Sequence, residues 1–345
     1  MGVVNTCCER IALRTAKRPE FAFKGRPDSD AWGVVTSQTM GLLSKQALKP
    51  WLKPMAGLVL LVGLFASLDT EALLQQLASA ELGWFLIGLI AAIAANLLCS
   101  LRWQRIARAC ELGLATPWIQ WAKLYFQGIS INSVLPGGIV GGDVWRASQF
   151  KPFKSSGQAV FLERLAGLWG LFFISLGLGL TGLLMFTDMS ESSETRALSL
   201  PWTLTTLYTS ALGLACLAPL AAPWLLPRKL SDALNLKLLT HGLGLSLASQ
   251  ALTVIAFWAC LKSAGLDLPF WLVGWLGSLI FLSALVPASI GGFGARELGV
   301  TILLGGLSTV PEAAAAGSIL FGLTATFQGL IGLVFWFADR KRPKA

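Results

Sequence analysis

Chemically capable side chains in this 345-residue chain gather beside glycine-rich breaks in otherwise apolar sequence. In the first such segment, residues 126–150, Pro136 is followed by four glycines and then by Asp143 and Arg146. A glycine-rich turn that opens a helix presents free backbone N–H groups and the positive end of the helix dipole, which favours phosphate. An arginine at that turn adds bidentate phosphate recognition. The first segment therefore predicts a phosphate site.

The second segment, residues 285–304, repeats this order. Pro287 precedes three glycines, and the pair Arg296–Glu297 follows at the start of the next predicted helix. Neither segment contains G-x-x-x-x-G-K-[ST], so the sequence does not support a nucleotide-binding P-loop.

The predicted phosphate-binding residues are two arginines, one amide and the glycines of both breaks. They are Asn132, Gly137, Gly138, Gly141, Gly142, Arg146, Gly291, Gly292 and Arg296. Pro136 and Pro287 are the predicted helix breaks, because proline removes a backbone donor. The predicted supporting charges are Asp143, Glu163, Arg164 and Glu297.

Two interpretations of these charges remain open. A charged side chain at the centre of a membrane helix costs about 2.5–3.5 kcal/mol on translocon-based scales. The charges therefore either pair near the interface and only hold the segments in place, or line a polar cavity and bind a charged substrate. We expect the first role for Glu163 and Glu297, and the second for Arg146 and Arg296.

The usual catalytic and metal-binding constellations do not occur in the sequence. His241 is the only histidine, and the six cysteines form no C-x-x-C pair. We therefore expect no metal, no cofactor, no catalytic residue and no enzymatic activity of its own.

Composition indicates a polytopic integral membrane protein of the all-α class. Hydrophobic residues make up 54% of the chain and charged residues only 13%, about half of the ~25% typical of soluble domains. The net charge of +9 resides at the ends, with +5 in residues 1–53 and +3 in residues 339–345. Because residues 54–338 are nearly neutral, nucleic acid is not an expected partner.

Six full membrane spans follow from apolar runs, since a spanning helix needs about 20 apolar residues. The predicted spans are residues 54–68 (a short one), 83–101, 163–186, 202–226, 238–262 and 314–337. Two further apolar regions, 116–150 and 269–309, contain the proline–glycine breaks.

The distribution of basic residues predicts that both termini are cytoplasmic. Lysines precede the first span, and Arg102, Arg105 and Arg108 follow the second. Region 116–150 then lies between two basic loops, so it must enter and leave on the cytoplasmic side. Region 269–309 must enter and leave from the outside, either as a re-entrant hairpin, which we favour, or as two short spans that raise the count to eight. One unit used in both orientations indicates an inverted repeat.

Three parts of the chain are expected from these patterns. Residues 1–50 form a basic, disordered, cytoplasmic extension, residues 51–338 the membrane domain, and residues 339–345 a basic cytoplasmic tail. The opening MGVVNT and the two cysteines after it also fit a lipidation pattern, and Met40 is an alternative start.

Three motifs in order resemble the lysylphosphatidylglycerol synthase transmembrane, or flippase-like, family. They are N-x-x-L-P-G-G…G-G-D-x-x-R at Asn132–Arg146, L-E-R-L at Leu162–Leu165 and P-x-S-I-G-G-x-G-x-R-E at Pro287–Glu297. The resemblance covers about residues 50–338 and implies an all-helical membrane domain that moves a modified lipid across the bilayer. Because only about eight residues follow the last predicted span, the soluble aminoacyl-transferase domain of the synthases is not expected here.

Three functions are compatible with these observations. The favoured one is a translocase that moves a phosphate-bearing lipid, a phospholipid or a polyprenyl phosphate, between leaflets of the inner membrane. The alternatives are a lipid-phosphate glycosyl or aminoacyl transferase with Asp143 or Glu163 as base, and a non-catalytic partner of a separately encoded lipid-modifying enzyme. A homo-oligomer also remains open.

Overall fold

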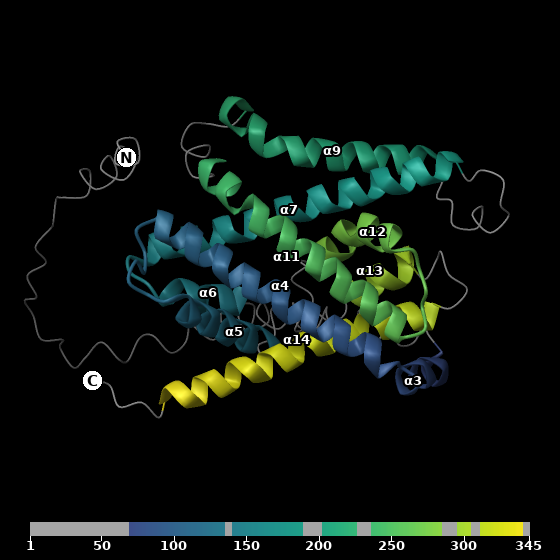
Figure 1. Ribbon diagram of the computed structural model, residues 1–345, viewed down its shortest axis with the longest axis horizontal. Coiled ribbons are helices and arrows are strands. Elements are labelled where there is room, and N and C mark those ends of the chain that lie inside the picture. The colour runs from purple at the N-terminus through teal and green to yellow at the C-terminus, as the bar shows by residue number, and fades with distance from the viewer. Residues whose placement is uncertain are drawn as a thin grey trace, which may run out of the picture. The chain divides into compact units, whose positions relative to one another are not determined.

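The described part of the chain is built from α-helices and the turns that join them. The computed structural model describes residues 69–134, 140–188, 202–225, 236–284, 295–304 and 311–340, and these contain no β-strand (Figure 1). The predicted all-α class is therefore confirmed. The predicted span 54–68, Pro136, Gly137, Gly138, Pro287, Gly291 and Gly292 lie outside the described residues.

Four of the helices are long and apolar enough to cross a membrane: α4 (Leu82–Ala109), α7 (Phe153–Asp188), α11 (Leu236–Ser263) and α14 (Pro311–Arg340). They coincide with four of the predicted spans. The predicted span 202–226 is also helical, as α9 (Trp202–Leu225). Exposed leucines such as Leu207 and Leu214 lie on α9, as expected of a helix that faces lipid.

The described residues of both predicted broken regions contain two helices each. The first contains α5 (Trp118–Val134) and α6 (Val140–Ser148), and the second contains α12 (Phe270–Ser283) and α13 (Ala295–Leu303). We call α5–α6 the first hairpin and α12–α13 the second hairpin. Asp143 and Glu297 each lie in the first turn of the returning helix. The depth of the hairpins in the bilayer stays a prediction.

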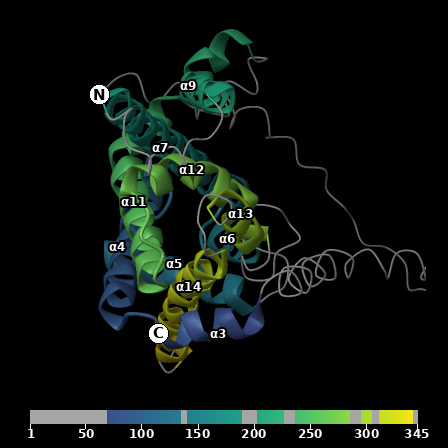
Figure 2. The same cartoon turned by 90° about the vertical axis from the view of Figure 1, so that its right-hand side faces the viewer.

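The order long helix, hairpin, long helix occurs twice, as α4, α5–α6, α7 and as α11, α12–α13, α14. The packing repeats as well, because α5 packs on α14 just as α12 packs on α7, and α6 packs on α7 just as α13 packs on α14. Helices α4 and α11, of 28 residues each, lie side by side and join the two repeats (Figures 1 and 2).

The central pair of helices is antiparallel. Trp84 near the start of α4 stacks edge-on against Trp258 near the end of α11, and Arg102 near the end of α4 hydrogen-bonds to Ser246 in the first half of α11. The central helices of the two repeats therefore run in opposite directions. This is the arrangement of an inverted repeat, as predicted.

Glycines on the last helix of each repeat let the hairpin of the other repeat approach closely. A Cβ at Gly332 of α14 would collide with the Phe126 carbonyl of α5, and a Cβ at Gly182 of α7 would collide with the Trp271 ring of α12. Small residues at helix contacts are the usual means of association in lipid. In this chain they join the two repeats to each other.

A short amphipathic helix, α3 (Thr70–Ala78), precedes α4 and packs on α14. Asp69 caps it by accepting hydrogen bonds from the backbone N–H groups of Glu71 and Ala72.

Aromatic side chains fill the core at each hairpin. Trp121 of the first hairpin packs between Trp103 and Phe150, and Phe281 of the second hairpin packs with Phe257 and Phe321.

Candidate phosphate site at the first hairpin

Glu163 is the centre of a buried charge cluster beside the first hairpin. The membrane span predicted from the sequence, 163–186, begins at this residue. Helix α7 begins earlier, at Phe153, so Glu163 lies about 15 Å from the start of the helix. Its side chain is fully buried. Each of its two carboxylate oxygens therefore needs a partner within the protein.

Two arginines from different helices supply those partners. Arg102 Nη2 of α4 donates to Glu163 Oε1 over 2.5 Å, and Arg146 Nη2 of α6 donates to Glu163 Oε2 over 2.9 Å. Both guanidinium groups are almost completely buried. Glu163 thus joins the first long helix and the returning hairpin helix through one carboxylate.

Arg102 corrects one step of the sequence interpretation. Its position after an apolar run predicts a base in a cytoplasmic loop, but α4 continues to Ala109 and Arg102 is only 2% exposed. Arg105 and Arg108 on the same helix are exposed and fit the predicted loop role better. Sequence patterns missed Arg102 as a site residue because its partners lie far away along the chain.

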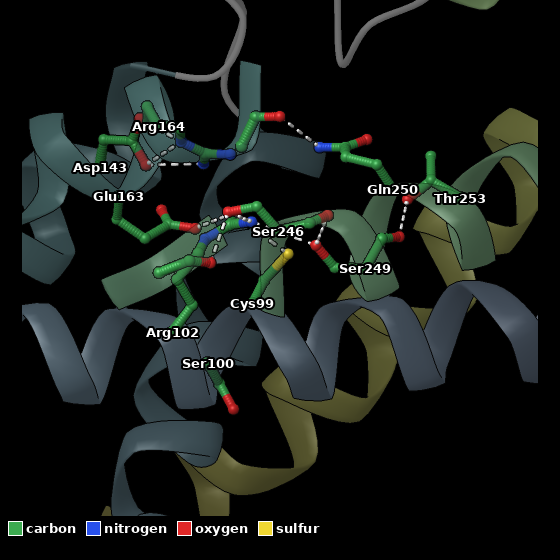
Figure 3. A network of polar contacts seen from close by, with 12 residues as sticks. Cys99, Ser100, Arg102, Asp143, Glu163, Arg164, Ser246, Ser249, Gln250 and Thr253 are labelled. Carbon is green, nitrogen blue, oxygen red and sulfur yellow. Dashed lines mark hydrogen bonds and ion pairs between the residues drawn. The ribbon is translucent and has the colours of Figure 1, made fainter. Parts of the chain in front are cut away.

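Asp143 and Arg164 form a second, more exposed layer of the cluster. Arg164 Nη2 and Nε donate to the two oxygens of Asp143 over 2.7 and 3.0 Å (Figure 3). Asp143 Oδ1 also lies 3.3 Å from Arg146 Nη2. Asp143 and Arg146 therefore lie on one face of α6, as their spacing of three residues predicts. The whole cluster contains three arginines and two carboxylates.

Arg146 keeps unused hydrogen-bonding capacity. Its Nη2 contacts both carboxylates, whereas its Nε and Nη1 are buried and have no hydrogen-bond partner. The guanidinium carbon lies 4.6 Å from the Tyr125 ring centre and 4.9 Å from the Trp103 ring centre. Two aromatic rings thus hold a planar cation that still has donors for an anion.

Glycines bring the helices of the first hairpin together around Arg146. A Cβ at Gly142 would collide with the Gly128 carbonyl, and a Cβ at Gly128 would lie 3.2 Å from Arg146 Cγ. Asn132 Oδ1 accepts a hydrogen bond from the Gly142 backbone N–H over 2.6 Å. Asn132 and Gly142 therefore lie together beside Arg146. Gly141 directly precedes Gly142 in the first turn of α6.

Arg296 and Glu297 occupy the corresponding place in the second hairpin. Arg296 Nη2 donates to Glu297 Oε1 over 2.6 Å and to the Ser318 carbonyl over 3.1 Å, and its Nε donates to Ser318 Oγ over 3.2 Å. The guanidinium also lies over the Phe321 ring, at 5.2 Å from its centre. One arginine and one carboxylate thus link α13 to α14.

The described residues contain no group of three or more His, Cys, Asp or Glu side chains that could hold a metal ion. The side chain of His241 lies outside the described set.

Comparison with known families agrees with this architecture. Residues 51–332 match the family described as the lysylphosphatidylglycerol synthase TM region. The chain belongs to this family. The match includes α3 through most of α14 and both hairpins. Among curated proteins, no relative matches the chain.

Family membership and the apolar helices together identify a multi-pass membrane protein of the lysylphosphatidylglycerol synthase, or flippase, type. The resemblance stated from the sequence motifs is thereby confirmed. The inner membrane as its location, the cytoplasmic side of its termini and the three-part division of the chain stay predictions.

Proposed function

We propose that this protein is a translocase that moves a phosphate-bearing lipid between the leaflets of the inner membrane, with both termini in the cytoplasm. The observation that carries the proposal is Arg146, a buried arginine whose Nε and Nη1 have no partner among the described residues. A buried donor without a partner is costly, so such groups are expected at sites that receive a ligand.

Charge balance supports an anionic ligand at the first hairpin. Asp143 and Glu163 neutralise only two of the three arginines in the cluster. A phosphate group that enters beside Arg146 compensates the remaining cation and accepts its free N–H groups. The lipid chains stay in the bilayer while the headgroup passes the glycine-lined face of the hairpin.

The second hairpin has a different role in this proposal. Arg296 already has a carboxylate, a hydroxyl and a carbonyl as partners, so it secures α13 against α14. A direct contact of Arg296 with the headgroup stays a prediction. Lipid transport by the double variant Arg296→Met/Glu297→Leu tests it.

Reconstitution provides the test of transport. The full chain is placed in liposomes that contain a fluorescent phospholipid, and the dye in the outer leaflet is quenched chemically. We expect wild-type protein to make inner-leaflet lipid accessible to the quencher faster than protein-free liposomes do. A polyprenyl phosphate assayed in the same way identifies which lipid class moves.

Arg146→Ala is the informative variant, because Arg102 still pairs with Glu163 and the remaining charges balance. Arg105→Ala is the matched control, since Arg105 is an exposed arginine in the last turns of α4. Transport by wild type and Arg105→Ala but not by Arg146→Ala supports the proposal. No transport by wild type above empty liposomes for any lipid contradicts it. Covalent product formed from a lipid and an added donor would instead favour a transferase.

A further inference from the structure

Arg102 connects the candidate phosphate site to the contact between the two repeats. Its Nη2 donates to Glu163 of α7 in the first repeat. Its Nη1 donates to the hydroxyl oxygens of Ser246 and Ser249 on α11 of the second repeat, each over 3.1 Å (Figure 3). One side chain thus contacts both repeats at once.

The two serines present acceptors to Arg102. Ser246 Oγ donates its own proton to the Gly242 carbonyl, and Ser249 Oγ donates to the Ser246 carbonyl. With both protons directed along α11, the lone pairs of the hydroxyl oxygens point toward the guanidinium. The serines are fully or almost fully buried, so water does not replace them in this contact.

Close helix packing surrounds the same point. A Cβ at Gly170 of α7 would lie 2.7 Å from Ser246 Cβ, and a Cβ at Gly167 would lie 2.9 Å from Arg102 Nη2. Gln250 of α11 also donates to the Gly167 carbonyl over 3.1 Å. Helices α4, α7 and α11 therefore meet at Arg102, and a displacement of one repeat relative to the other must alter its contacts.

Glu163 lies between Arg102 and the candidate ligand site. Arg102 uses Oε1 of this carboxylate and Arg146 uses Oε2. A phosphate that accepts from the free Nε and Nη1 of Arg146 shares the charge of this guanidinium with Oε2 of Glu163, and so weakens the attraction between the two side chains. Because a buried carboxylate cannot remain unpaired without a large cost, Glu163 then depends more strongly on Arg102.

We propose that Arg102 is a positioning residue that couples occupation of Arg146 by the lipid phosphate to movement of the second repeat against the first. This inference rests on the proposed translocase function. Arg102 itself does not contact the lipid. It retains Glu163 when the phosphate arrives, and it transmits the change to α11 through Ser246 and Ser249.

The double variant Ser246→Ala/Ser249→Ala tests the coupling, because it removes the contact to α11 and leaves the Arg102–Glu163 ion pair in place. We expect lipid transport in the liposome assay to fall at least about tenfold, since each of the two hydrogen bonds lost to a charged group is worth about that factor. Binding of short-chain phosphatidylglycerol, measured as the ligand-induced rise in melting temperature in detergent, should remain unchanged. Ser175→Ala, which removes a buried hydrogen bond between α7 and α12, is the matched control and should keep wild-type transport.

A second variant, Arg102→Lys, keeps the positive charge beside Glu163 but cannot contact all three partners at once. As for the double serine variant, we expect normal binding of short-chain phosphatidylglycerol together with slow lipid transport. Wild-type transport rates in both variants would overturn the coupling while the translocase function stands. A parallel loss of binding and transport would also overturn it, because Arg102 would then only maintain the site. Absence of transport in the wild type removes the proposed function and the coupling together.

Discussion

The first and second hairpins have corresponding helices but different charge chemistry. At the first hairpin, three arginines share two carboxylates, and Arg146 keeps free donors. At the second, Arg296 pairs with Glu297 and is held by Ser318. An inverted repeat duplicates the backbone arrangement, but it does not require both copies to bind the substrate. In the proposed function, this difference favours ligand binding at the first hairpin and anchoring at the second.

The largest effect on stability is expected at Glu163. Glu163→Ala leaves Arg102 and Arg146 buried without their shared carboxylate, and breaking a buried ion pair in this way costs about 3–5 kcal/mol. Thermal unfolding of the purified protein in detergent, followed by circular dichroism, measures the loss. A change below about 1 kcal/mol would mean that water or lipid already reaches the cluster, because such a surface pair contributes that little.

The helices could be predicted well from sequence and the charge network could not. Hydropathy placed α4, α7, α11 and α14, and proline with glycine marked both breaks, because these signals are local. Arg102 follows directly after an apolar run, so sequence patterns assign it to a loop. Its burial depends on Ser246, which is 144 positions away, and on Glu163, which is 61 positions away. That Arg146 retains two free donors depends on three helices meeting, and no spacing rule contains that information.

The next largest effect on stability is expected from glycine-to-alanine changes, and it should differ between the two hairpins. Gly142→Ala drives a methyl group into the Gly128 backbone and the Asn132 amide, whereas Gly299→Ala meets only the Ser283 side chain at 2.7 Å. We expect Gly142→Ala to cost about 1–3 kcal/mol, as overpacking does, and Gly299→Ala to cost less because a hydroxyl can rotate away. The melting temperatures of the two variants measure this order, and the reverse order would show that the first hairpin relaxes more easily than its packing suggests.

Gly157→Ala is the matched control for both glycine variants. A Cβ at this position of α7 meets nothing within 4 Å. Because alanine is favoured over glycine in a helix by about 1 kcal/mol, this variant should be equal to or slightly more stable than wild type. A large loss of stability here would show that any glycine-to-alanine change is harmful in this fold.

The smallest effect on stability is expected when the charges of the second hairpin are removed together. Arg296→Met/Glu297→Leu replaces a neutral buried pair with apolar side chains, and such exchanges are often neutral or stabilising. Single removal of Arg296 should be far more damaging, because Glu297 would lose its nearest cation. Melting temperatures of the single and double variants measure the contrast. Equal losses in the two would indicate that Arg296 has a role beyond pairing.

The comparison of the two hairpins is tested most directly by lipid transport in liposomes that contain either Arg146→Ala or Arg296→Met/Glu297→Leu. We expect Arg146→Ala to lower the transport rate at least about tenfold, as loss of hydrogen bonds to a charged group would, while the double variant keeps most of the wild-type rate. Loss of transport in the double variant, with normal transport in Arg146→Ala, would contradict the assignment of the headgroup to the first hairpin.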